Sequence, residues 1–136
     1  PPDYRDSWPV HCLADSPGAA FHPAVAPAIE EADAIFRKGR DRAAYSGFEG
    51  ATVTPDGAPG EPLAHWLHAR AIEAVDIVGI ATDHCVRATA LDAVAEGLRT
   101  RVLLDLTAGV AAESTQAALE QLREAGAELV GSPRLG

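Results

Sequence analysis

The hydrophobic pattern is clearest in the second half of the chain, where short apolar runs alternate with segments of helical periodicity. The runs over 75–81, 101–106 and 128–130 predict three strands, because each is aliphatic and is bounded by glycine or polar residues. Apolar residues at helical spacing predict one helix over about 83–97 and another that ends at Gly126. Strands that alternate with helices pair in parallel through right-handed crossovers, so we expect an α/β fold.

The first half of the chain has weaker patterns. Residues 1–24 show neither a period of 2 nor one of 3.6, which predicts a long ordered loop. The run over 32–38 predicts a short strand, and the turn formers over 40–60 predict a second loop. A helix is expected after Gly60, on the apolar residues Leu63, Trp66, Leu67 and Ile72. With no internal repeat or linker, the chain is predicted to form one domain over 1–136.

The composition narrows the class of partner. At 136 residues and 47% hydrophobic content, the chain can bury the core of a single domain. Its formal net charge of -9 argues against nucleic acid and anionic membranes, since we expect no basic cluster to interrupt the acidic balance. A small soluble molecule is the better hypothesis. Because Cys12 and Cys85 lie far apart and no signal peptide or apolar transmembrane span is seen, we expect no disulfide and a cytoplasmic location.

Cys85 is the residue with the clearest chemistry. It follows the apolar run over 75–81 and begins the next predicted helix. A thiol at a helix N-terminus meets unpaired backbone N–H groups and the positive end of the helix dipole, which favour a nucleophilic thiolate. The backbone amides of Ala81 and Cys85 are candidates for an oxyanion hole. The alternative is a small buried cysteine in a turn, without a catalytic role.

Parallel strands place their carboxyl ends at one edge of a sheet, where ligands bind. Lys38, Cys85 and the turn at Thr107 are therefore expected at the same edge. An ammonium near the thiol would stabilise the thiolate, although a lysine that ends a strand is also commonly a solvated surface group. His65 and His68 share one helix face and could hold a metal, but no third ligand stands at matching spacing, so a solvated face is expected.

Five motifs occur in an order and at a spacing that match a known family. They are Trp8-Pro9-Val10-His11-Cys12, Gly18-Ala19-Ala20-Phe21-His22-Pro23, Phe36-Arg37-Lys38-Gly39, Tyr45-Ser46-Gly47-Phe48-Glu49-Gly50 and Gly79-Ile80-Ala81-Thr82-Asp83-His84-Cys85-Val86. In these motifs the chain resembles the nicotinamidase/pyrazinamidase branch of the isochorismatase-like cysteine hydrolases, along essentially its whole length. The resemblance implies a three-layer αβα fold on a mostly parallel, doubly wound, Rossmann-like sheet.

The resemblance also implies a reaction, the hydrolysis of nicotinamide to nicotinate and ammonia through a cysteine thioester. The family uses an Asp-Lys-Cys triad, in which Cys85 matches the nucleophile and Lys38 the lysine. The amides of Ala81 and Cys85 match the oxyanion hole, with a cis peptide bond before Ala81. Pyrazinamide is left open as a further substrate.

A divalent metal, zinc or iron, is the cofactor that the resemblance implies. In the family it is held by one aspartate and three histidines, and it binds the ring nitrogen of the substrate. His11 matches the last of these histidines. Trp8 and Tyr45 match aromatic residues of the substrate pocket, and Ala81 contacts substrate through its amide.

The chain also departs from the pattern of the family. The family begins with a strand that ends in the triad aspartate, followed by a helix and a second strand with an Asp-x-His and a further histidine, and none of these precedes Pro1. The chain contains no methionine. We therefore expect that an N-terminal part is missing and that the sheet lacks the family's first two strands. Without them the chain alone is expected to be inactive and at best marginally folded.

Two alternatives stay open beside this hypothesis. One is another isochorismatase-like cysteine amidase. The other is a non-catalytic pseudoenzyme that serves as an oligomerisation or regulatory subunit, although such a chain would have no physical need to keep Lys38, His11 and Cys85 together. For the main hypothesis we expect a monomer or homo-oligomer that acts in NAD salvage.

Overall fold

The computed structural model describes residues 1–135 and divides into two compact units, Pro1–Ala34 and Ile35–Gly136, each described here by itself. The first unit contains a short 3₁₀ turn, η1 (Pro17–Ala19), and one helix, α1 (Ala26–Glu30). Within 1–135, no helix has the length and hydropathy to span a bilayer. The prediction of a single domain over 1–136 stays a prediction.

The second unit contains the strands and the longer helices. In chain order its elements are η2 (Gly47–Glu49), β1 (Ala51–Val53), β2 (Pro59–Pro62), α2 (Leu63–Ala69), β3 (Ala74–Ile80), η3 (Thr82–Val86), α3 (Arg87–Ala95), β4 (Arg99–Gly109), α4 (Ala112–Ala125), β5 (Glu128–Val130) and β6 (Arg134–Leu135). β1 and β2 form an antiparallel hairpin, whereas β3, β4 and β5 form a parallel sheet in that order, with β6 also parallel to β4. The predicted α/β class with a parallel sheet is confirmed.

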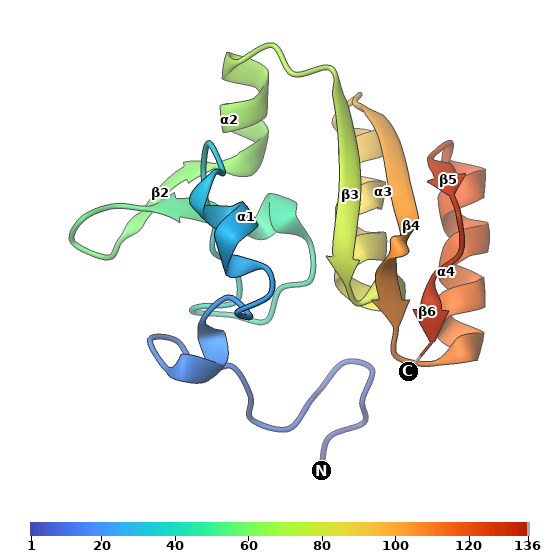
Figure 1. Ribbon diagram of the computed structural model, residues 1–136, viewed down its shortest axis with the longest axis horizontal. Helices are drawn as coiled ribbons and strands as arrows, with labels where there is room; N and C mark the ends of the chain where they lie inside the picture. The colour runs from blue at the N-terminus through green and yellow to red at the C-terminus, as the bar shows by residue number, and fades with distance from the viewer. Residues whose placement is uncertain (136) are drawn as a thin grey trace. The chain divides into compact units, whose positions relative to one another are not determined.

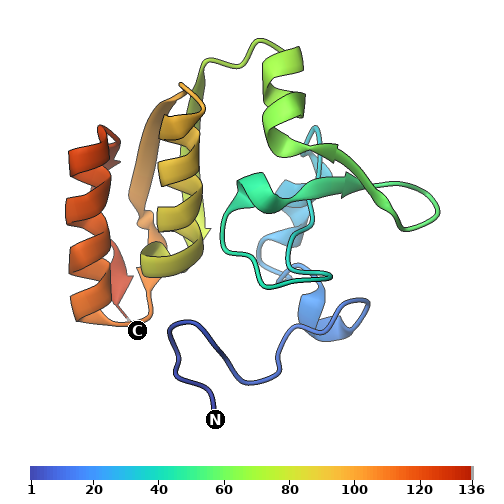
Figure 2. The same ribbon diagram turned by 180° about the vertical axis from the view of Figure 1, so that it is seen from behind.

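Helices α3 and α4 cover one face of the parallel sheet, as the two opposite views show (Figure 1 and Figure 2). The core between them consists of aliphatic side chains from these elements: Val86, Ala90, Val102, Leu104, Leu119, Leu122 and Ala127. A second cluster joins Leu67 of α2 to Ala93 and Leu98. Of the three layers that the resemblance implies, this unit therefore contains the sheet and one helical layer.

The opposite face of the sheet is exposed. The residues of β3 alternate between partly buried and exposed, with Val78 50% and Ile80 75% exposed, and Leu106 of β4 is 63% exposed. Only the face of β3 toward the helices is covered. An aliphatic strand with one face uncovered leaves apolar area in contact with water.

Two further expectations are corrected. Over 32–38 there is no strand of the parallel sheet; Arg37 alone makes an antiparallel bridge, and its partner is Ala51 of β1. The hairpin supplies the hydrogen bonds that the sheet was expected to supply. The prediction of a turn at Thr107 is also wrong. β4 continues to Gly109 and pairs near this end with β3 and β6.

Candidate active site

Cys85 lies in η3, the turn that follows β3 at its carboxyl end, and it is half-buried. The turn is of the π type, in which the Val86 N–H donates to the Ala81 carbonyl at 3.1 Å across five residues. The sequence predicted that a helix begins here, and α3 does follow η3 directly. The peptide bond between Ile80 and Ala81 is cis, as the resemblance implied.

The side chain of Lys38 reaches this turn. Its Nζ lies 3.5 Å from the Cys85 Sγ and also donates to the Ala44 carbonyl at 3.1 Å. An ammonium at this distance stabilises negative charge on sulfur, and the carbonyl contact fixes its position. The structure therefore brings together two residues that are 47 positions apart in the sequence.

Asp83 is a functional residue that the sequence reasoning missed. Its buried carboxylate accepts hydrogen bonds from the N–H of Val110 at 3.0 Å and of Ala111 at 3.3 Å, and from the Ser114 hydroxyl at 2.5 Å. Burial disfavours the charged carboxylate, but these hydrogen bonds outweigh it and hold the pKa of Asp83 below its ordinary value. Asp83 thereby ties the turn that carries Cys85 to the start of α4.

Two more polar contacts hold the same turn. The Thr82 hydroxyl donates to the Thr107 hydroxyl at 2.9 Å, and Thr107 in turn donates to the Leu104 carbonyl at 2.9 Å. Both threonines are buried, so these bonds are protected from competing water. From α3, the Arg87 Nε donates to the Asp83 carbonyl at 3.1 Å. In the sequence, Thr82 and Asp83 are two polar residues directly after an apolar strand, a position that does not by itself distinguish an anchoring residue from a solvated one.

Tyr45 lies beside the turn, with its ring centroid 5.3 Å from that of His84. It precedes η2, which is closed by a capping box: the Ser46 hydroxyl accepts from the backbone of η2, and the Glu49 carboxylate accepts from the Ser46 N–H at 3.0 Å. The same carboxylate also accepts from the Tyr45 N–H at 3.0 Å. η2 is in turn fixed to α3, since the Gly47 N–H donates to the Thr89 hydroxyl at 2.9 Å. Of the predicted site residues, Lys38, Tyr45, Ala81 and Cys85 thus belong to one unit; their roles stay predictions.

Trp8 and His11 belong to the first unit. The ring of Trp8 makes an edge-to-face contact with Tyr4, with centroids 5.8 Å apart. The Nδ1 of His11 lies 2.6 Å from the Pro9 carbonyl oxygen. Because a carbonyl only accepts, Nδ1 is the donor in this contact, and in the neutral imidazole Nε2 is then the nitrogen with a lone pair for a metal. Their roles in the pocket and in metal binding stay predictions.

The described residues do not complete a metal site. Residues 1–135 contain no group of three or more histidine, cysteine, aspartate or glutamate side chains that could hold a metal ion. The two histidines of α2 each contact a different carboxylate: His65 Nδ1 lies 2.6 Å from Glu61 Oε1, and His68 Nε2 lies 2.9 Å from Glu96 Oε2. Among residues 1–135, His11 stays the single metal ligand that the resemblance implies.

Comparisons with known proteins add to this geometry. The family model described as Isochorismatase domain matches residues 1–133. Over 131 residues the chain is 56% identical to the nicotinamidase/pyrazinamidase of Mycobacterium tuberculosis (strain H37Rv), covering 96% of this chain and 67% of that protein. It is 37% identical over 128 residues to the nicotinamidase of Acinetobacter baylyi, of which it spans 57%.

Two solved structures are informative. The pyrazinamidase of Pyrococcus horikoshii in complex with zinc is similar with a TM-score of 0.72 at 37% identity, over 90% of this chain and 62% of that one. PnC1 of L. infantum in complex with nicotinate is similar with a TM-score of 0.76 at 34% identity, over 95% of this chain and 63% of that one. The chain therefore spans less than two thirds of either solved relative.

Proposed function

This chain belongs to the isochorismatase family, and on that premise we propose that it is part of an amide hydrolase that converts nicotinamide to nicotinate and ammonia. The observation that carries the proposal is the 3.5 Å approach of the Lys38 ammonium to the Cys85 sulfur at the carboxyl end of β3. The names of the relatives support the substrate, since the M. tuberculosis protein is a nicotinamidase/pyrazinamidase and the L. infantum structure contains nicotinate.

The proposed reaction begins with attack of the Cys85 thiolate on the amide carbon. The amides of Ala81 and Cys85 hold the oxyanion that develops, the C–N bond breaks, and ammonia leaves with one proton gained. Water then attacks the thioester, which returns the thiol and releases the carboxylic acid. The Lys38 ammonium stabilises the thiolate at the start and at the end of this cycle.

A proton must pass from the thiol to the leaving nitrogen, and Asp83 is unsuited to carry it. Its oxygens already accept three hydrogen bonds, and its lowered pKa makes it a weak base. We propose that the proton carrier is a carboxylate in the part of the relatives' length that this chain does not span. The 136-residue chain by itself is then inactive.

We propose that the complete protein holds a divalent metal, with His11 as one ligand. The Pyrococcus relative in complex with zinc supports this, and the protonated Nδ1 of His11 leaves Nε2 available. When bound, such a metal would act as a Lewis acid that holds the ring nitrogen of the substrate, and Trp8 and Tyr45 are the aromatic residues expected to contact the ring. Pyrazinamide, a ring of the same shape, is a second substrate on the strength of the M. tuberculosis relative. A cytoplasmic role in NAD salvage stays a prediction.

The test is ammonia release from nicotinamide by the full-length protein. Cys85→Ala should abolish it, because the nucleophile is lost while the buried contacts of Thr82 and Asp83 remain. Cys12→Ala is the matched control: it removes the other cysteine, which is exposed, and should keep full activity. Retained activity in Cys85→Ala would refute the proposal, and activity against amides other than nicotinamide and pyrazinamide would favour another cysteine amidase.

A further inference from the structure

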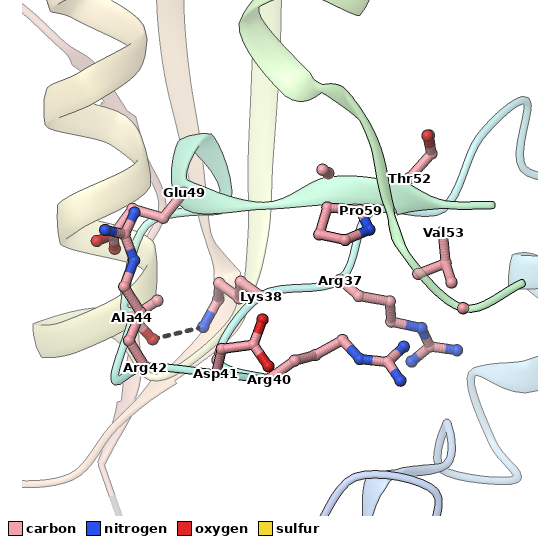
Figure 3. Close-up of a pocket in the computed structure, with 13 residues that line it drawn as sticks. Arg37, Lys38, Arg40, Asp41, Arg42, Ala44, Glu49, Thr52, Val53 and Pro59 are labelled. Atoms are coloured by element: carbon pink, nitrogen blue, oxygen red, sulfur yellow. Dashed lines mark hydrogen bonds between the residues drawn. The ribbon is translucent and has the colours of Figure 1, made fainter.

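A pocket of about 390 Å³ lies in the second unit beside Lys38, between the loop over 37–44 and the β1–β2 hairpin (Figure 3). Its hairpin wall is formed by Thr52 and Val53 of β1 and by Pro59 of β2. The two walls are joined by the bridge in which Arg37 and Ala51 exchange backbone hydrogen bonds of 2.8 and 3.1 Å. Lys38 is the member of the pocket that also reaches the candidate active site.

The charge of this pocket is opposite to that of the chain. Its charged lining residues are Arg37, Lys38, Arg40, Arg42, Asp41 and Glu49, four cations against two anions, in a chain whose net charge is -9. Glu49 uses its carboxylate to close η2, where it accepts from two backbone N–H groups. The expectation that no basic cluster interrupts the acidic balance is therefore wrong at 37–42.

We propose that this pocket binds a phosphate group. Figure 3 draws the side chains of Arg37 and Arg40 extending toward the same side of the pocket. Guanidinium groups bind phosphate oxygens in pairs through parallel N–H donors, and a dianion gains more than a single charge from several nearby cations. A pocket of about 390 Å³ has room for a phosphate and for part of a larger molecule that carries it.

A phosphate bound in this pocket would affect Cys85 in the candidate active site through Lys38. The same ammonium lines the pocket and lies 3.5 Å from the Cys85 sulfur, so a dianion in the pocket competes with the thiolate for it. This consequence rests on the proposed function. Phosphate binding itself does not, because the cations that line the pocket are present whether or not Cys85 is a nucleophile.

The test is calorimetric titration of the full-length protein, without nicotinamide, at constant ionic strength. Inorganic phosphate, pyrophosphate and a nucleoside diphosphate are the probes, and sodium chloride is the reference. Arg37→Gln and Arg40→Gln should each weaken phosphate binding about two- to fivefold, the range for one exposed ion pair. Arg123→Gln is the matched control, since it removes the same charge from the exposed side of α4 and should leave the Kd unchanged.

The proposal is supported if phosphate binding saturates and is weakened by Arg40→Gln but not by Arg123→Gln. A Kd for the nucleoside diphosphate that is tighter than the Kd for pyrophosphate, which carries the same two phosphates, identifies a nucleotide as the source of the phosphate, and equal affinity for these two probes identifies the phosphate groups alone. The proposal is overturned if chloride reproduces the heat, if binding does not saturate, or if the three variants behave alike. Because no substrate is present, these outcomes are independent of whether nicotinamide is hydrolysed.

Discussion

The two segments that bring lysine and cysteine together are held in different ways. The turn with Cys85 is anchored by buried polar bonds, from Thr82 to β4 and from Asp83 to the start of α4. The loop with Lys38 is exposed and is held by backbone bonds to β1 and by one contact to Ala44. Changes to the residues that anchor the turn should therefore cost stability together with activity, whereas changes in the loop should cost activity alone.

The largest expected effect separates these two costs. Lys38→Ala in the full-length protein should lower the rate of ammonia release by roughly a hundred- to a thousandfold, because the thiolate loses its counter-charge. Its melting temperature should stay unchanged, since the Lys38 side chain is exposed. Steady-state kinetics and calorimetry on the same sample would check both. A loss of melting temperature in step with the rate would mean that the loop is a structural element.

The second largest effect is expected in the turn that carries Cys85, where a substitution at Asp83 should lower stability. Asp83→Ala removes three hydrogen bonds to a buried carboxylate and leaves the N–H groups of Val110 and Ala111 without their acceptor. The free energy of unfolding should fall by about 3 kcal/mol, measured by urea denaturation. Asp33→Asn, at an exposed position of the first unit, is the control and should change little. An unfolding curve of Asp83→Ala that matches the control would contradict the anchoring role.

The pH dependence of stability is a second test of the anchoring role of Asp83. The folded-state pKa of Asp83 lies below its ordinary value, so the unfolded chain binds this proton more readily. The stability that Asp83 contributes is therefore present above about pH 4, the ordinary range of an aspartate, and is lost as pH falls through the lowered pKa. Urea midpoints measured across this window should fall more steeply for the wild type than for Asp83→Asn. Parallel curves would show that Asp83 is not the group responsible.

The smallest expected effect concerns the second anchor. Thr107→Val keeps the shape of the side chain but removes the hydroxyl that accepts from Thr82 and donates to the Leu104 carbonyl. The free energy of unfolding should fall by about 1 to 2 kcal/mol, less than for Asp83→Ala, because no charge is involved. Thr107→Ser, which keeps the hydroxyl, should recover most of the loss of hydrogen bonding. A Thr107→Ser variant no better than Thr107→Val would point to lost packing instead.

Much of the sheet could be predicted because its signals are local. β5 was predicted with its bounds, β3 within one residue at each end, and the stop of α4 at Gly126 follows from its φ of 97°. The β1–β2 hairpin was missed because β1 has only three residues and β2 carries two prolines and a glycine instead of alternating apolar residues. The exposed face of β3 could not be read from an aliphatic run, which looks the same whether one or both faces are covered.

Of the candidate site, the sequence predicted Lys38 and Cys85 but not Asp83, the residue that anchors the turn with Cys85. Lys38 and Cys85 were expected at one edge of the sheet because each stands at the carboxyl end of a predicted strand, and their pairing followed from the resemblance. The strand over 32–38 is absent from the parallel sheet, yet the contact forms between residues 47 positions apart. The anchoring role of Asp83 was missed because it depends on hydrogen-bond partners 27 to 31 positions further along the chain, at Val110, Ala111 and Ser114. Nothing in the local pattern distinguishes such an aspartate from a solvated one.

The central claim is that Cys85, with Lys38 beside it, is the nucleophile. Its most direct test is peptide mass spectrometry on the full-length protein, quenched in acid during turnover of nicotinamide. The account predicts an acyl thioester on the peptide that contains Cys85 and none on the peptide that contains Cys12, with slower formation in Lys38→Ala. An adduct on another residue, or an equal rate of formation in Lys38→Ala, would contradict it.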